Sequence, residues 1–339
     1  MNRIAALDGL RAIAAIAVVG FHVKLPGLLG GFIGVDIFFV LSGYLITSLL
    51  AAEVNRTGGI ALGRFVWRRA LRLVPALLLM LAGVAALMPV FFPGKDILSE
   101  IVLSGLYISN ISQVVSRLPE VTGHTWSLST EMQFYLVWPI LLLAMLTRLP
   151  RRHLWLVLLG LYTLASGWRY LQFWEHGWIR AYYPPDTRLS GLLLGALVAT
   201  LKWRPSAGSV DLMAIGALAT LAVSVWGPFF YFEPASTWRG SVVEIAAGLL
   251  ILSLLTGEGR IAAALAHPAL LAVGVWSYGI YLWHYPIALV ARAALDPLSA
   301  FAVTLALSTL LAALSYRFVE RPLQNWLRPA RLPAVVSST

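Results

Sequence analysis

Two apolar segments of membrane-spanning length open the sequence, and both carry ionisable side chains. The first contains Asp8, Arg11 and His22, and the second begins near Asp36. An ionisable side chain inside hydrocarbon costs about 2.5–3.5 kcal/mol on insertion scales, so such residues normally face a protein interior or a water-filled cavity. We therefore expect this helical hairpin to form one wall of a functional site.

The composition indicates the class of protein. Hydrophobic residues make up 59% of the 339 positions and charged residues 12%, with a mean hydropathy of +0.81, which indicates an all-α integral membrane protein. The net charge of +10 is typical of Lys and Arg gathered in cytoplasmic loops near anionic lipids, so we expect membrane lipids and no nucleic acid as partners. The absence of cysteine excludes a thiolate nucleophile.

The membrane topology depends on one ambiguous stretch, residues 97–115. If it does not cross, most Lys and Arg residues fall on the side of the N-terminus, which the positive-inside rule makes cytoplasmic. We therefore expect 97–115 to be re-entrant or interfacial, both termini to be cytoplasmic, residues 1–323 to form one membrane domain and 324–339 a short cytoplasmic tail. The ten expected spans, arranged around a polar cavity, are about residues 4–23, 33–52, 73–92, 127–146, 154–172, 187–201, 210–227, 240–256, 268–290 and 300–319.

Several polar and aromatic side chains fall at one depth in the outer half of this topology. At 1.5 Å per residue, His22 lies roughly 21 Å further along its helix than Asp8. The shared depth makes His22, whose imidazole can gain or lose a proton near pH 7, a candidate catalytic residue, and Glu131 a candidate to orient its ring. The expected substrate-binding residues at this depth are Asp36, Trp126, Arg188, Tyr281 and His284.

Each of these residues also has a structural alternative. His22 and His284 could be hydrogen-bonded structural histidines, and Glu131 could pair with an arginine to fix helix packing. Trp126 could belong to an aromatic belt at the membrane surface. Asp8 and Arg11 have the spacing of a bridge on one helix face.

A second group of candidate site residues lies in the arginine-rich segment GRFVWRRALRLVPA, residues 63–76. Arg68 and Arg72 are one helical turn apart, and Arg69 and Arg72 are three residues apart, so either pair can project together. The guanidinium fork binds phosphate oxygens in bidentate fashion, which favours a phosphorylated cytosolic ligand. The alternative is a juxtamembrane topology signal in contact with lipid phosphates.

Taken in order, several strings of this sequence closely resemble the membrane acyltransferase-3 family, across about residues 4–323. The resemblance implies an integral membrane O-acyltransferase of a bacterial-type inner or plasma membrane. It would move an acyl group, commonly acetyl, from cytosolic acyl-CoA to a hydroxyl, usually of an envelope or exported carbohydrate. The strings are DGLRA with His22, GVDIFFVLSGYLI at 34–46, the pair Arg69 and Arg72, HTWSLSTEMQFYLVWP at 124–139, TRLSGLLLGAL at 187–197, YGIYLWHYPI at 278–287 and ERPL at 320–323.

The resemblance also implies roles for particular residues. It gives catalytic importance to His22 and acyl-CoA binding to Arg69 and Arg72. Many relatives carry an extra helix and a C-terminal SGNH-type domain, and we expect this chain to be the single-domain form. His22 could act as general base on the acceptor hydroxyl or form an acyl-histidine intermediate, and Arg188 or Tyr281 could stabilise the oxyanion.

Two other functions are compatible with the residues alone. A proton-coupled transporter of a saccharide or related metabolite could use the same buried carboxylates and histidines. Direct use of ATP is not expected, because the sequence has no G-x-x-x-x-G-K-[ST] motif. A metal-dependent enzyme is not expected either, because no H-x-x-x-H or H-E-x-x-H spacing occurs.

Overall fold

The computed structural model describes residues 4–201, 203, 205–226 and 236–327, and this part of the chain is mainly helical, with no β-strand. The labels η1 to η3 mark 3₁₀ turns and η4 a π-helical turn. In chain order the elements are α1 (Ala5–His22), η1 (Gly31–Ile33), α2 (Gly34–Thr57), α3 (Leu62–Phe91), α4 (Ile97–Gly105), α5 (Ser109–Val115), η2 (Gly123–Thr125), α6 (Trp126–Arg148), η3 (Arg151–His153), α7 (Leu154–His176), α8 (Trp178–Tyr182), α9 (Pro185–Thr200), α10 (Ala207–Trp226), α12 (Trp238–Leu254), α13 (Arg260–Leu265), α14 (Pro268–Ala294), α15 (Pro297–Ser315), η4 (Tyr316–Glu320) and α16 (Arg321–Trp326).

The all-α membrane fold is confirmed, but the count of ten spans is not. All ten expected spans are helical in the structure, yet α9 and α12 have only 16 and 17 residues. The helices α7 and α14 are long enough to cross a membrane, but they are not among the segments that are also apolar enough. Six described segments are long and apolar enough to cross a membrane, namely Ala5–His22, Gly31–Thr57, Leu62–Phe91, Gly123–Arg148, Gly208–Trp226 and Pro297–Trp326.

The ambiguous stretch 97–115 is not one spanning helix. It forms α4, of nine residues, and α5, of seven residues, and each is far shorter than a membrane-spanning helix. Asp96 caps α4, because its side chain accepts hydrogen bonds from the backbone N–H groups of Leu98 and Ser99. The two short helices pack against α3 and α6, on the side of the bundle that carries the site described below.

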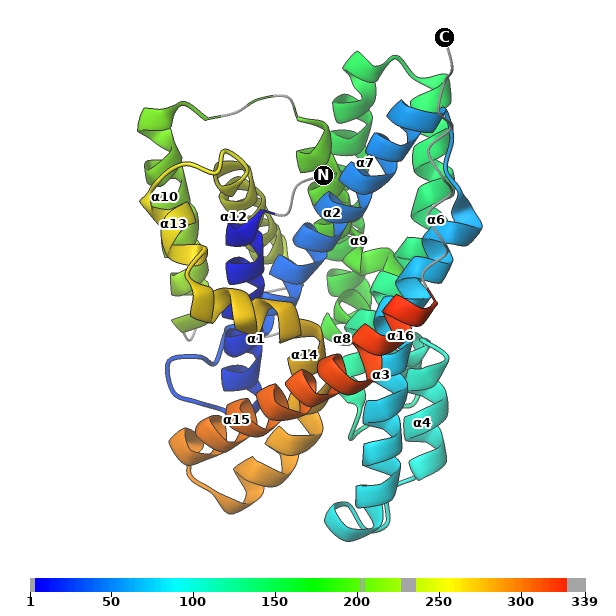
Figure 1. Cartoon of the computed structure of the whole chain (residues 1–339), viewed down its shortest axis with the longest axis vertical. Coiled ribbons are helices and arrows are strands. Elements are labelled where there is room, and N and C mark those ends of the chain that lie inside the picture. Colours follow the sequence, from blue (N-terminus) through cyan, green and yellow to red (C-terminus); the bar gives the residue numbers. More distant parts are fainter. Residues whose placement is uncertain (1–3, 202, 204, 227–235, 328–339) are drawn as a thin grey trace.

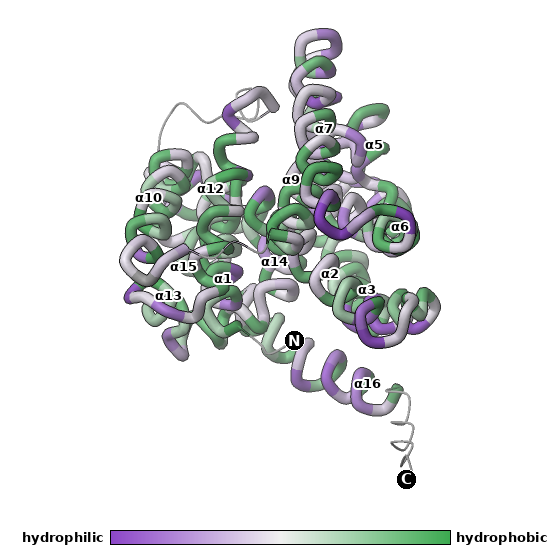
Figure 2. Tube along the Cα trace, turned by 90° about the horizontal axis from the view of Figure 1, so that it is seen from above, coloured by the Kyte–Doolittle hydropathy of each residue, from purple (hydrophilic) through white to green (hydrophobic). Residues whose placement is uncertain are grey.

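The helices are arranged as an elongated bundle (Figure 1). The long helix α3 runs down one side with α4 beside its lower part, while α10 and α13 lie on the opposite side. Figure 2 shows apolar residues distributed along the bundle helices, whereas the largely hydrophilic α16 extends away from them. This last helix crosses the predicted boundary between membrane domain and tail at residue 323, and residues 328–339 lie outside the described part.

Two pairs of helices approach each other closely, because a glycine of one helix faces a backbone carbonyl group of the other. A Cβ atom on Gly195 of α9 would lie 2.0 Å from the carbonyl oxygen of Val40 on α2. A Cβ atom on Gly274 of α14 would lie 2.1 Å from the carbonyl oxygen of Asp8 on α1. Small residues let membrane helices approach closely, and the second contact sets the polar residues of α1 directly against those of α14.

Candidate functional site

Two predicted site residues from opposite ends of the sequence meet between α1 and α14. His22 is the last residue of α1, and His284 lies in the second half of α14. The Nδ1 atom of His22 is 3.0 Å from the Nε2 atom of His284. Because His284 is fully buried, it is a partner of His22 rather than the substrate-binding residue that the sequence predicted.

Backbone carbonyl groups near the two histidine rings indicate which ring nitrogen of each carries the proton. The Nδ1 atom of His22 is 3.0 Å from the carbonyl oxygen of Val18, and that of His284 is 2.6 Å from the carbonyl oxygen of Tyr281. A carbonyl oxygen only accepts, so we place an N–H at both Nδ1 atoms of the neutral rings. The Nε2 atom of His284 then accepts from His22, and the Nε2 atom of His22 keeps its lone pair for a substrate proton.

His22 lines a cavity of about 590 Å³, which we call the histidine cavity. Arg292 of α14 also lines it and donates from Nη1 to the carbonyl oxygen of His22 at 3.0 Å, which ties the end of α1 to α14. The predicted residues Trp126 and Tyr281 are in its wall as well. The aromatic residues of the wall are Phe21, Phe32, Phe92, Trp126, Tyr182, Tyr183, Tyr281 and Tyr285.

A third histidine, His124 of η2, belongs to this site but was not among the residues predicted from the sequence. Its ring centroid is 5.3 Å from that of His284, and it lines the histidine cavity. The signal was present in the sequence, because His124 opens the string HTWSLSTEMQFY, from which only Trp126 and Glu131 were selected. Among the described residues, no group of three or more His, Cys, Asp or Glu is arranged to hold a metal ion.

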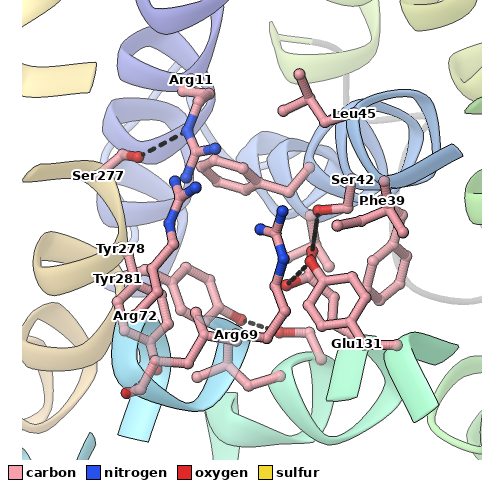
Figure 3. A pocket seen from close by; sticks show the side chains of 17 residues that line it. Arg11, Phe39, Ser42, Leu45, Arg69, Arg72, Glu131, Ser277, Tyr278 and Tyr281 are labelled. Carbon is pink, nitrogen blue, oxygen red and sulfur yellow. Dashed lines mark hydrogen bonds between the residues drawn. The ribbon is translucent and has the colours of Figure 1, made fainter. Parts of the chain in front are cut away.

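A second, smaller cavity of about 70 Å³, the arginine cavity, collects three guanidinium groups (Figure 3). Arg69 and Arg72 reach it from α3, and Arg11 reaches it from α1 and donates from Nε to Ser277 Oγ at 3.2 Å. Of the residues that line it, Glu131 alone carries a carboxylate. The cavity therefore holds more positive than negative charge.

The place of Glu131 corrects its predicted role. Its carboxylate accepts hydrogen bonds from Ser42 Oγ at 2.5 Å and from the Tyr135 hydroxyl at 3.3 Å, so it lies in the arginine cavity and does not orient His22. The reason is depth along α6, since Trp126 at the start of the helix reaches the histidine cavity and Glu131 is more than one turn further on.

The predicted arginines separate in the structure. Arg69 and Arg72 line the arginine cavity, whereas Arg68 is exposed and does not. Arg11, for which the sequence favoured a bridge to Asp8, belongs to the cavity wall. Only the tertiary packing of α14 against both α1 and α3 could reveal this position.

A third cavity of about 380 Å³, the entrance cavity, adjoins the arginine cavity on the side away from the histidines. Arg11, Arg72 and Tyr278 line both. Asp8 and Glu320 add two carboxylates to the wall of the entrance cavity.

Tyr281 lies between the arginine cavity and the histidine cavity, since it lines both. Its hydroxyl donates to the carbonyl oxygen of His124 at 2.9 Å and lies 2.6 Å from Ser127 Oγ. The entrance, arginine and histidine cavities thus follow one another through the bundle, and Tyr281 lies between the arginine cavity and the histidine cavity.

The predicted substrate-binding residues Asp36 and Arg188 bind each other instead. Arg188 Nη2 is 2.5 Å from Asp36 Oδ1, and their side chains are 1% and 3% exposed. The guanidinium also lies over the rings of Tyr182 and Trp126, at 4.8 and 5.5 Å from their centroids. Neither Asp36 nor Arg188 lines one of these cavities, because the rings of Tyr182 and Trp126 lie between Arg188 and the histidine cavity. The ion pair instead joins α2 to α9.

Fold and site together define an integral membrane protein that holds a histidine pair next to an arginine-lined cavity. The sequence matches the family described as "Acyltransferase domain" over residues 4–317, and the chain belongs to this family of membrane acyltransferases.

The comparisons also give named relatives. The chain is similar to "Putative O-acetyltransferase SACOL0978" of Staphylococcus aureus (strain COL), with 33% identity over 370 residues, covering 99% of this chain and 61% of that protein. It is also similar to "O-acetyltransferase OatA" of Staphylococcus aureus (strain NCTC 8325 / PS 47), with 34% identity over 347 residues, covering 94% and 57%. The chain thus spans about three fifths of the length of these relatives. No solved structure matches it.

Proposed function

We propose that this protein is a membrane O-acyltransferase that moves an acyl group from cytosolic acyl-CoA to a hydroxyl of an envelope or exported carbohydrate. The observation that carries the proposal is the order of the cavities: the arginine cavity, with its three guanidinium groups, and the histidine cavity, with the lone pair of His22, share Tyr281 and Val35 in their walls. The relatives named O-acetyltransferase support acetyl as the acyl group.

The arginine cavity suits the donor. Three guanidinium groups beside a single carboxylate favour an anionic ligand, and phosphate oxygens match the guanidinium fork. We place the CoA phosphates at Arg72, where the arginine cavity adjoins the entrance cavity, with the pantetheine arm directed past Arg69 and Arg11 toward Tyr281. The present space of about 70 Å³ is too small for that arm, so donor binding requires the cavity to widen.

The histidine cavity suits the acceptor. Its eight aromatic side chains offer flat surfaces for sugar rings, and its volume of about 590 Å³ is that of an ordinary small-molecule site. We orient this cavity toward the outside and the entrance cavity toward the cytoplasm, with both termini cytoplasmic, because most Lys and Arg residues then lie inside.

The chemistry follows from the lone pair on His22. Its Nε2 atom takes the proton from the acceptor hydroxyl while the hydroxyl oxygen attacks the thioester carbonyl carbon. The carbon–sulfur bond breaks, and the CoA thiolate leaves with the proton that His22 received. His284 holds the ring of His22 in the tautomer that this step needs.

The experiment is CoA release by purified protein in nanodiscs, with acetyl-CoA and a panel of sugar acceptors. We expect acceptor-dependent release in the wild type, its loss in His22→Ala, and a raised KM for acetyl-CoA in the double variant Arg69→Ala/Arg72→Ala. The matched control is Arg68→Ala, an exposed arginine of the same helix, which should behave as wild type. A fully active, well-folded His22→Ala protein would contradict the base mechanism. Sugar transport without any use of acyl-CoA would instead support the proton-coupled transporter.

A further inference from the structure

A proline in α14 leaves one backbone carbonyl without its helical donor. In an α-helix the carbonyl of residue i accepts from the N–H of residue i+4, and proline has no N–H. Pro286 lies inside α14, so the carbonyl oxygen of Leu282 loses this partner. The affected carbonyl lies within one turn of His284, the partner of His22.

His124 supplies the missing hydrogen bond. Its Nε2 atom is 3.0 Å from the carbonyl oxygen of Leu282, so this atom carries the proton and donates. The His124 side chain is buried, with 3% exposure. The backbone of His124 is held to the same turn of α14, because its carbonyl oxygen accepts from the Tyr281 hydroxyl at 2.9 Å.

A buried carboxylate fixes the loop that carries His124. Glu100 of α4 is 1% exposed, and its Oε1 atom accepts from the backbone N–H groups of Glu120 and Val121, at 2.6 and 2.9 Å. Its Oε2 atom accepts from both the N–H and the hydroxyl of Thr122, at 2.7 Å each. Four hydrogen bonds to a single carboxylate hold residues 120–122 in one conformation.

These contacts form a continuous series of hydrogen bonds from Glu100 of α4 to the imidazole ring of His22. Glu100 holds the loop, and His124 at the end of the loop binds Leu282 and Tyr281. The carbonyl of Tyr281 accepts from His284 Nδ1 at 2.6 Å, and His284 Nε2 accepts from His22.

We propose that His124 and Glu100 are positioning residues for the acyl transfer: through the carbonyl left free by Pro286 they fix the turn of α14 that presents His284 to His22. The short helix α4 thereby gains a role beyond covering the bundle. The inference rests on the proposed function only for its kinetic readout.

The kinetic test compares two replacements of His124. In His124→Leu the N–H donor to Leu282 is absent, whereas the amide of His124→Gln can place an N–H near the position of Nε2. We expect His124→Leu to lower kcat for acetyl transfer about tenfold, the value of one lost hydrogen bond of roughly 1.4 kcal/mol, with an unchanged KM for acetyl-CoA. The Gln variant should keep most of kcat. Equal losses in both variants, or full activity in His124→Leu, overturn the proposal.

A second variant tests the anchor of the loop. Glu100→Gln removes the charge and one acceptor oxygen, and it should lower kcat without raising the KM for acetyl-CoA. The control is Asp211→Asn, because Asp211 also holds a turn through two backbone N–H groups, those of Arg260 and Ile261, and takes no part in the contacts that lead from Glu100 to His22. A kcat loss as large in the control as in Glu100→Gln contradicts the positioning role.

A chemical readout is independent of the enzyme activity. Diethyl pyrocarbonate modifies accessible imidazoles, and mass spectrometry can follow each histidine separately. We expect His284 to be protected in the wild type and to react in His124→Leu, with the exposed His153, His176 and His267 as internal references. Unchanged protection of His284 overturns the proposal. If the wild type transfers no acetyl group, this measurement still decides the positioning role while the proposed function fails.

Discussion

His22 and His284 are 262 positions apart in the sequence, yet the Nδ1 atom of one lies 3.0 Å from the Nε2 atom of the other. The contact exists because Gly274 lets α14 lie directly against the backbone of α1 near Asp8. The close contact between α1 and α14 at Gly274 thus helps to bring His22 and His284 together further along the same two helices.

The first prediction concerns His284. His284→Leu removes one of the two acceptors of the His22 Nδ1–H, so that only the carbonyl oxygen of Val18 still favours this tautomer and ring orientation. We expect kcat for acetyl transfer to fall about tenfold or more, less than the roughly 10²-fold or greater loss in His22→Ala, because general base catalysis contributes about 10²–10⁴-fold. The measurement is acceptor-dependent CoA release. A larger loss for His284→Leu than for His22→Ala would contradict this assignment of base and partner.

The second prediction concerns Arg11, which the tertiary structure adds to the donor site. Arg11→Gln removes one guanidinium from the arginine cavity, and a charge-assisted hydrogen bond contributes about 1.5–3 kcal/mol. We expect the KM for acetyl-CoA to rise at least about tenfold while kcat changes little. The control is Arg56→Gln, at the exposed end of α2. Equal KM values for the two variants would remove Arg11 from the donor site.

The third prediction concerns the buried pair of Asp36 and Arg188. Arg188→Met leaves an uncompensated carboxylate in the protein interior, which costs about 3–5 kcal/mol. We expect a clearly lower melting temperature in detergent, and partial recovery in the double variant Asp36→Asn/Arg188→Met.

The control for that pair is already present in the chain. Arg180 and Asp186 form a partly exposed ion pair, with side chains 27% and 42% exposed. Arg180→Met should cost no more than about 1 kcal/mol, since water screens such pairs. Similar losses of melting temperature for Arg180→Met and Arg188→Met would show that burial does not set the stability of the Asp36–Arg188 pair.

The fourth prediction concerns the approach of α1 to α14. Gly274→Ala places a methyl group 2.1 Å from the carbonyl oxygen of Asp8, so the helices must separate. We expect a loss of both melting temperature and acetyl transfer. The same change at Gly160, in the middle of α7, meets no atom within 4 Å and should be neutral or stabilise the helix by up to about 1 kcal/mol. If Gly274→Ala is as stable and active as Gly160→Ala, close packing at this point does not position His22.

The sequence determined the membrane class, the position of the helices and most of the residue types of the site. Apolar periodicity and length suffice for this, because each spanning helix satisfies its backbone hydrogen bonds by itself. The distribution of Lys and Arg predicted that residues 97–115 do not form a single spanning helix. Ionisable residues near the membrane segments, together with the family resemblance, pointed to His22, Arg69 and Arg72.

Tertiary structure alone decided which side chains meet. Residues at one depth on different helices can face one another or face apart, and depth does not give the rotation of a helix about its axis. For that reason Asp36 and Arg188 turned out to bind each other, Glu131 joined the arginines, and His284 rather than Glu131 became the partner of His22. The histidine pair, the partition at Tyr281 and the hydrogen bond from His124 to Leu282 are contacts between distant segments, and only the packing of the helices creates them.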